Sequence, residues 1–150
     1  MTLHDAVRTE IEALHEFFVG WFSGALDRNA EVFADGFQRR FCDDFLLVPP
    51  AGTRLAVADL GGGVERAHGS NREFRIAIRA VEIQLQTPTV VVATYEEWQR
   101  NAMASTPPDN GRIATVVFER AAADSMALRW RLVHETWLPA EVMAAGDYDF

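Results

Sequence analysis

Residues 128–139 read LRWRLVHETWLP and carry the clearest strand signal in the sequence. Strand side chains alternate between two faces, so we expect Trp130 and His134 on one face and Arg131 and Glu135 on the other. The stretch is rich in tryptophan and aliphatic residues, which favour strands. We therefore expect the last strand of a curved sheet, with His134 midway along an apolar row that faces a pocket.

The start of the chain predicts a long amphipathic helix. Between residues 3 and 21, apolar side chains recur three or four positions apart, which is the spacing of one helix face. Thr2 is placed to cap this helix, with Asp5 at the capping-box position. A second, shorter helix is expected at residues 27–34, before Gly36.

The remainder of the chain predicts a sheet. The apolar alternation within residues 73–86 changes phase, which a strand can accommodate only with a bulge or a sharp bend. The glycines of residues 61–69 predict a loop that has room for one helical turn, and residues 140–150 form an acidic tail that either docks or is disordered. The expected strands cover residues 45–48, 53–58, 73–86, 89–101, 112–121 and 128–139.

This order predicts a single α+β domain that spans residues 1–150. Two helices come first, and four to six mostly antiparallel strands follow. Long strands, one bulge and a long N-terminal helix suggest a cone, in which a strongly bent sheet wraps around that helix. One helix cannot fill the whole concave side of such a sheet, so we expect a cavity there.

Composition excludes several classes of function. The 150 residues carry a formal net charge of -8, which argues against binding to nucleic acid or to an anionic membrane surface. There is no lysine, so Schiff-base chemistry is excluded. Cys42 is the only cysteine, and the histidines lack metal-binding spacing, so we predict no metal and no cofactor. No apolar run approaches the ~20 residues of a membrane span, and we expect a cytoplasmic protein.

His134 and Glu96 are the candidate catalytic residues. A histidine in an apolar row can act as a general base or acid, because its ordinary pKa is near neutrality. Glu96, on a neighbouring strand, could orient His134 or act as a second acid or base. The alternatives are structural: His134 bonded to a carbonyl group, and Glu96 held in a cross-strand ion pair.

Aromatic residues are the candidate ligand contacts. Pockets are mostly apolar and aromatic, so four large rings are assigned to the walls of a ligand site. The alternative is that at least two of the tryptophans belong to the core or to a dimer interface. The candidates are Trp98, Trp130, Tyr95 and Trp21.

Three stretches together resemble the nuclear transport factor 2-like superfamily, which includes ketosteroid isomerase-like and polyketide cyclase-like proteins. They are residues 33–52, with Phe41-Cys42-Asp43-Asp44-Phe45 and a Pro-Pro turn, residues 89–99, and Trp130-Arg131-Leu132-Val133-His134. The resemblance implies a conical pocket and a homodimer formed through the outer face of the sheet. Its members include isomerases, dehydratases, cyclases and domains with no demonstrated chemistry. The Asp/Tyr constellation of the isomerases has no match in this sequence, so no catalytic residue is carried over.

Three functions remain open from the sequence, of which the weakest is a paralogue that shares only the fold and acts in the assembly of another protein. The first is a protein that holds a small apolar molecule, with isomerisation, dehydration or cyclisation by acid/base proton transfer if it is an enzyme. The second is a non-enzymatic homodimeric binding or interaction domain whose cone is filled by side chains. A cavity of a few hundred Å³ would favour the first.

Overall fold

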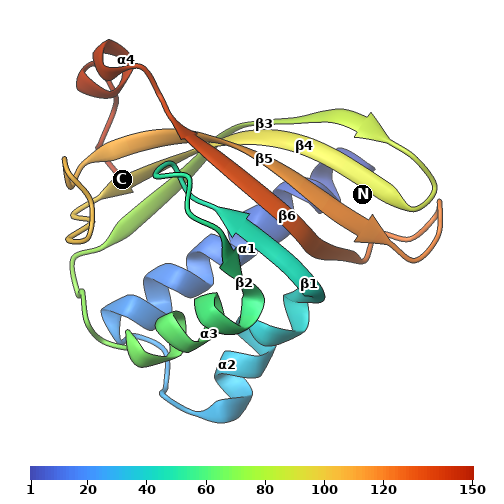
Figure 1. The fold of residues 1–150 in the computed structure, drawn as a ribbon, viewed down its shortest axis with the longest axis horizontal. Helices are drawn as coiled ribbons and strands as arrows, with labels where there is room; N and C mark the ends of the chain where they lie inside the picture. The colour runs from blue at the N-terminus through green and yellow to red at the C-terminus, as the bar shows by residue number, and fades with distance from the viewer.

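The computed structural model describes residues 1–150 and confirms the expected α+β fold class (Figure 1). Its six strands form one bent, open sheet in the order β2-β1-β6-β5-β4-β3. All neighbouring strands are antiparallel except β1 and β6, which are parallel. The elements are α1 (Leu3–Ser23), α2 (Ala30–Gly36), a 3₁₀ turn (Gln38–Arg40), β1 (Phe41–Val48), β2 (Leu55–Ala56), α3 (Val57–Arg66), β3 (Arg75–Gln86), β4 (Val90–Arg100), β5 (Asn110–Arg120), β6 (Leu128–Trp137) and α4 (Ala140–Ala144).

Helix α1 begins as the sequence predicts. The Thr2 side chain accepts a hydrogen bond from the Asp5 amide, and the Asp5 carboxylate accepts one from the Thr2 backbone N–H, which completes a capping box. The apolar face of α1 buries Val7, Ile11 and Trp21. In Figure 1, α1 runs along the inner face of the sheet, α3 lies beside β1 and β2, and α2 lies below α3.

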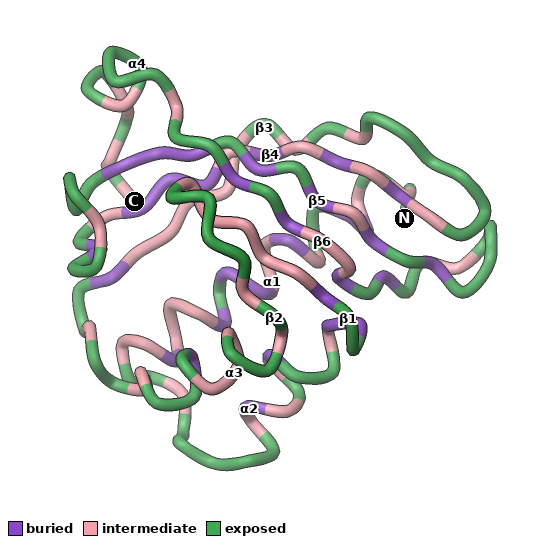
Figure 2. The backbone as a smooth tube through the Cα atoms, in the orientation of Figure 1, coloured by how far each residue is buried: buried purple, intermediate pink, exposed green.

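Burial alternates along β4 and β5, so one face of the sheet forms the core (Figure 2). The inner face of β4 starts with Val91 and Ala93, which are fully buried. The expected bulge in β3 is present: the pairing with β4 shifts between Arg79 and Glu82, and Ala80 has a φ of 55°. This bulge bends the sheet around α1.

A second irregularity, in β6, overturns the simple alternation expected there. Val117 pairs with Leu132, but Phe118 pairs with Trp130, so Arg131 is an extra residue in the ladder. A bulge of this kind reverses the phase of every residue that follows it. Trp130 therefore faces inward as expected, but after Arg131 the inward residues are Val133 and Glu135, and His134 faces outward.

Two loop expectations also change. Residues 61–69 were expected to be a loop, but Gly61, Gly62 and Gly63 lie inside α3. Val57, Leu60 and Val64 supply the apolar contacts of this helix with the core, and tertiary packing of this kind outweighs the low helix propensity of glycine. The expected strand at residues 53–58 is reduced to the two residues of β2.

The C-terminal tail docks on the outer face of the sheet. The Tyr148 ring lies 5.6 Å from that of Trp98, and Gly146 lies so close to Trp98 that a Cβ there would come within 2.2 Å of the indole. Arg79 and Arg100 donate hydrogen bonds to backbone carbonyls of the tail. The helices of the structure are all too short or too polar to cross a membrane.

Candidate functional site

A cavity of about 210 Å³ lies between α1 and the inner face of the sheet. Helix α3 and strand β1 close one side of it. Most of its wall is apolar, because aromatic and aliphatic residues of six different elements point into it. Those that form the apolar part include Phe18, Phe22, Phe41, Phe45, Trp130 and Val133.

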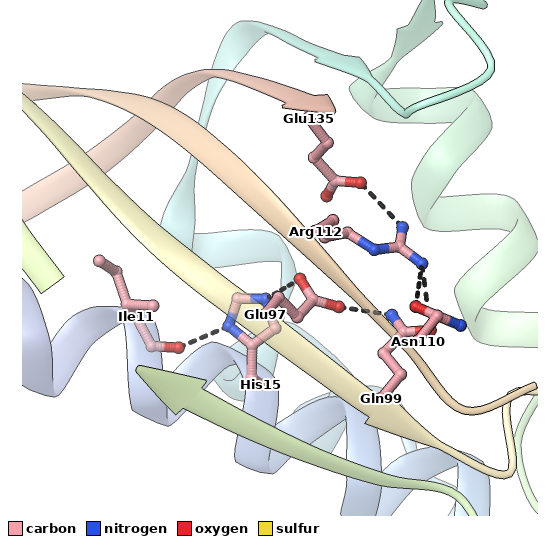
Figure 3. Close-up of polar contacts among 7 residues, drawn as sticks. All are labelled: Ile11, His15, Glu97, Gln99, Asn110, Arg112 and Glu135. Atoms are coloured by element: carbon pink, nitrogen blue, oxygen red, sulfur yellow. Dashed lines mark hydrogen bonds and ion pairs between the residues drawn. The ribbon is translucent and has the colours of Figure 1, made fainter. Parts of the chain in front are cut away.

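The other part of the wall is polar, and strand register explains why. Along the inner face of β4, Tyr95 is followed by Glu97 and Gln99. The β4–β5 ladder sets Glu97 opposite Arg112, and the β5–β6 ladder sets Ala114 opposite Glu135. Side chains at paired positions share a face, so the charged residues of three strands meet at one place in the cavity (Figure 3).

Helix α1 adds His15 to this cluster. Its Nδ1 lies 2.7 Å from the carbonyl oxygen of Ile11, and its Nε2 lies 3.0 Å from Oε1 of Glu97. A carbonyl oxygen only accepts, so Nδ1 carries a proton. The Nε2–Glu97 contact then needs a proton of its own, held either by the imidazole or by the carboxyl group. In both cases the His15–Glu97 pair is neutral overall.

Arg112 connects the rest of the cluster. It donates from Nη1 to Oε2 of Glu135 at 2.9 Å, and from Nη2 to Gln99 at 3.2 Å and to Asn110 at 3.3 Å. Gln99 in turn donates to Glu97, so an unbroken chain of hydrogen bonds runs from His15 to Glu135 (Figure 3). The Trp137 ring covers the guanidinium at 4.7 Å. The Nε of Arg112 is buried and has no acceptor.

The pKa values of the two glutamates are displaced in opposite directions. Burial by itself raises the pKa of Glu97, but the charge and hydrogen bond of His15, together with Arg112, outweigh burial and hold it low, at about 2. Burial also lowers the pKa of His15, but Glu97 outweighs it and raises that pKa. The pair is therefore an imidazolium facing a carboxylate.

Glu135 is the carboxyl group whose pKa rises. Burial raises it first, and the negative charge of Glu97 raises it further, against the opposing effect of Arg112. The result is a pKa of about 7 for Glu135. Two carboxyl groups in one buried polar cluster thus have pKa values on different sides of the ordinary glutamate value, which is the arrangement of acid/base catalytic sites.

Two of the four predicted ligand contacts line the cavity. Tyr95 and Trp130 both face it. Burial raises the pKa of Tyr95, which keeps its hydroxyl protonated, and this hydroxyl has no hydrogen-bond partner in the protein. The Trp130 indole donates to Glu10 at 3.0 Å, which fixes the ring in the wall.

The other predicted contacts, Trp98 and Trp21, lie elsewhere. Trp98 is on the outer face of the sheet under the C-terminal tail. Trp21 packs against Phe33 in the core and donates to the carbonyl of Val64 at 2.8 Å. Neither residue lines the cavity.

The expectation that His134 and Glu96 face the pocket is wrong. His134 is exposed on the outer face, because the extra residue Arg131 reverses the alternation of β6. Glu96 shares its face of β4 with Trp98 and accepts a hydrogen bond from that indole at 2.9 Å. No hydrogen bond connects Glu96 with His134.

Four residues of the cluster, His15, Glu97, Arg112 and Glu135, were not assigned to a site from the sequence. A signal existed for His15, which lies between Ile11 and Phe18 within the apolar stripe of the first helix. The inner face of β4 could not be distinguished from its outer face by alternation alone, because both carry a glutamate. The position of Glu135 depends on the bulge, which leaves no pattern in the sequence.

A second group of potential metal ligands lies away from the cavity. Ligand atoms of Cys42, Asp44 and Glu119 are within 4.8 Å of one another. The Cys42 thiol donates to Glu119, and burial raises its pKa to about 11, so the thiol keeps its proton. Arg131 already supplies positive charge to both carboxylates. This cluster is therefore explained by its own contacts.

Comparisons with known proteins place the fold. The sequence matches no family model and no curated protein. Among solved structures, an NTF2-like protein of unknown function from Pseudomonas aeruginosa is 27% identical, with a TM-score of 0.75 over 89% of this chain and 99% of that one. A candidate dehydratase of the NTF2-like family from Streptomyces avermitilis is 13% identical, with a TM-score of 0.63 over 91% and 96%. A candidate ketosteroid isomerase from Shewanella frigidimarina is 11% identical, with a TM-score of 0.60 over 87% and 94%.

Proposed function

Because the chain belongs to the nuclear transport factor 2-like superfamily, we propose that its cavity binds a small, mainly apolar molecule and catalyses a proton transfer without a cofactor. Isomerisation, dehydration and cyclisation are the reaction types that such a site supports. Each needs a group that gives or takes a proton close to the substrate, in surroundings that exclude water.

The observation that carries this proposal is the position of Glu135. Its carboxyl group lies on the cavity wall, bonded to Arg112, with a pKa of about 7. A general acid or base works best when its pKa is near the operating pH, because both protonation states are then available. Glu135 is therefore assigned as the group that exchanges a proton with the substrate.

His15 and Glu97 act as positioning residues. Nδ1 of His15 is held by Ile11, and its Nε2 by Glu97, so neither nitrogen is free for a substrate. Their contribution is electrostatic. The charge of Glu97 raises the pKa of Glu135, while the imidazolium neutralises Glu97 and holds it in place.

The alternative, a purely structural homodimer, would require a cone filled by side chains. The cavity of about 210 Å³ favours the ligand-binding function over this alternative. That volume is below the ~300–1,000 Å³ typical of pockets for drug-sized ligands, so the ligand is smaller than those.

Homodimerisation through the outer sheet face stays a prediction. Ile113 and His134 are exposed there, and sedimentation velocity would measure the subunit count.

The test begins with native mass spectrometry of the protein purified from its source, which reports any small molecule that co-purifies. That molecule and a panel of small carbonyl and hydroxy compounds are then incubated with the protein in D₂O. Proton NMR measures exchange at carbon, and mass spectrometry measures loss of water. We expect turnover by the unmodified protein and a loss of about 10²–10⁴-fold in Glu135→Gln, the usual contribution of a general acid or base.

Two outer-face variants serve as matched controls. Glu96→Gln makes the same chemical change on β4, on the outer face of the sheet, and His134→Ala removes the exposed histidine of β6. Both should retain full turnover. Equal activity of Glu135→Gln and the unmodified protein would overturn the assignment of Glu135.

A further inference from the structure

Two hydrogen-bond donors in the polar part of the cavity have no acceptor in the protein. Arg112 is only 8% exposed, yet its Nε has no acceptor, and the Tyr95 hydroxyl, on a residue that lines the same cavity, makes no hydrogen bond with the protein. A buried donor that makes no hydrogen bond lowers the stability of the folded state. A ligand that brings acceptor oxygens to the Tyr95 hydroxyl and to the second N–H of Arg112 Nη1, which makes only one hydrogen bond, would satisfy donors that the protein leaves free.

The charge balance also favours an anion. The charged and titratable groups that surround Glu135 are Arg112 on β5, Glu97 and Tyr95 on β4, and His15 on α1. His15 and Glu97 neutralise each other, and Tyr95 keeps its proton. Arg112 is then balanced by Glu135 alone. Whenever Glu135 is protonated, the cavity holds one unbalanced buried positive charge, which is costly.

The remaining wall sets the shape of the ligand. Beyond the polar cluster the cavity is bordered by aromatic rings, among them Phe18, Phe22, Phe41 and Phe45. Such a wall offers nothing to a second charged or polar group. The ligand therefore has one polar end and one apolar end, within a space of about 210 Å³.

We propose that the natural ligand of this cavity is a small monocarboxylate with an aryl or alkyl tail, whose carboxylate is held between Arg112 and a protonated Glu135. Arg112 donates N–H bonds to the carboxylate, and Glu135 donates its O–H to one of the carboxylate oxygens. The tail packs among the phenylalanines. This inference rests on the proposed function, because it names the ligand class of that same pocket.

Binding of this kind takes up a proton. Glu135 must be protonated in the complex, and its pKa in the free protein is about 7. At pH 6 the proton is already present. Above pH 7 it has to be taken from solution, so the affinity for the carboxylate should fall about tenfold for each further pH unit. The affinity for an uncharged analogue should not depend on pH in this range.

Isothermal titration calorimetry with matched ligands tests the inference. The probes are 3-phenylpropionate and 3-phenylpropanamide, which have the same number of heavy atoms and differ in charge, with hexanoate and hexanamide as the aliphatic pair. Titrations at pH 6, 7 and 8 in buffers of different ionisation enthalpy also report proton uptake. We expect the carboxylates to bind at least tenfold more tightly than their amides at pH 6, with a preference that shrinks at pH 8.

Glu135→Gln is the informative variant. Glutamine has the size of a protonated glutamate and keeps an N–H donor, so carboxylate binding should persist, lose its pH dependence and proceed without proton uptake. Arg112→Met should lose the preference for carboxylates, but it also leaves Glu135 without a counterion and lowers stability. Glu135→Gln therefore carries the test, with Glu96→Gln as the control that behaves like the unmodified protein.

The outcomes separate this inference from the proposed function. Amides that bind as tightly as carboxylates would overturn the carboxylate inference and leave the proposed function standing. A pH-linked preference for carboxylates without turnover of any compound would support the inference and overturn the catalytic role of Glu135. If none of the four probes binds, both the inference and the assignment of this cavity as a ligand site are overturned.

Discussion

His15 and Glu97 are 82 positions apart in the sequence, and their Nε2 and Oε1 atoms lie 3.0 Å apart in the core. The side chains of both are about 6% exposed. This contact connects the long helix to the sheet and starts the hydrogen-bond chain that ends at Glu135. It lies among aromatic rings, where an unpaired charge would be expensive.

Glu97→Gln should lower both the free energy of unfolding and the pKa of His15. Glutamine keeps the shape of glutamate but lacks the charge that holds His15 protonated. We expect the free energy of unfolding to fall by about 1.5–3 kcal/mol, the usual value of a hydrogen bond to a charged group. Urea denaturation at pH 7 measures this loss, and NMR titration should find the pKa of His15 lowered. An unchanged pKa of His15 would contradict the ion pair, while Glu96→Gln should stay within about 0.5 kcal/mol of the unmodified protein.

The stability of the protein should fall as pH rises through neutrality, and Glu135 should account for much of the fall. Its pKa is about 7 in the folded chain, above its ordinary value of 4.5, so between these values the folded state holds a proton that the unfolded state has lost. Stability therefore decreases as pH rises across this interval, by about 3 kcal/mol in total. His15 acts in the same direction, because its pKa is raised and its contribution disappears as pH rises through that value.

Glu135→Gln isolates the glutamate's share of that fall. Glutamine does not ionise, so the variant lacks this loss of stability. We expect its free energy of unfolding, relative to that of the unmodified protein, to rise by up to about 3 kcal/mol between pH 5 and pH 8. Denaturant unfolding at these two pH values is the measurement. Parallel pH profiles for Glu135→Gln and the unmodified protein would show that the pKa of Glu135 is not raised.

Tyr95→Phe should weaken ligand binding without lowering the stability of the protein. The Tyr95 hydroxyl has no partner in the protein, so its loss leaves no orphaned group behind. We expect 3-phenylpropionate to bind about two- to tenfold more weakly, the cost of one neutral hydrogen bond. Tyr148→Phe is the matched control. Its hydroxyl donates to Met143 in the tail, so that variant should loosen the tail without changing the affinity. A large drop in the melting temperature of Tyr95→Phe would indicate a structural role instead.

Two glycine-to-alanine variants should shift stability in opposite directions. A Cβ at Gly63, inside α3, would meet no atom within 4 Å, so Gly63→Ala should add about 0.5–1 kcal/mol through helix propensity. A Cβ at Gly36 would lie 2.1 Å from the Phe17 ring, so Gly36→Ala should cost about 1–3 kcal/mol through overpacking. Thermal unfolding of the two variants side by side checks the contrast. Equal shifts would contradict the close packing of α2 against α1.

The candidate site could be predicted from the sequence only in part. Tyr95 and Trp130 were assigned to the wall of a pocket, and both line it. His134 and Glu96 were assigned to its interior, and both are on the outer face. Alternation sorts the residues of a strand into two sets, but it does not say which set faces the core when both sets contain apolar and charged residues.

The sequence by itself determined the class of the fold. Helical periodicity and the Thr2–Asp5 capping box specified α1, and alternation with a phase change specified long strands and the bulge in β3. These signals are local, because each depends on residues within a few positions of one another. They suffice to predict a bent sheet around a helix, since each element must bury its apolar face.

Only the tertiary structure decided which residues meet in the cavity. One extra residue, Arg131, turns Glu135 inward and His134 outward. Strand register then brings Glu135 to Arg112, and the packing of α1 brings His15 to Glu97. The physical reason is that these contacts join elements far apart in the chain. Their geometry is set by ladder register and helix placement, which depend on the packing of the whole core and not on any single stretch of sequence.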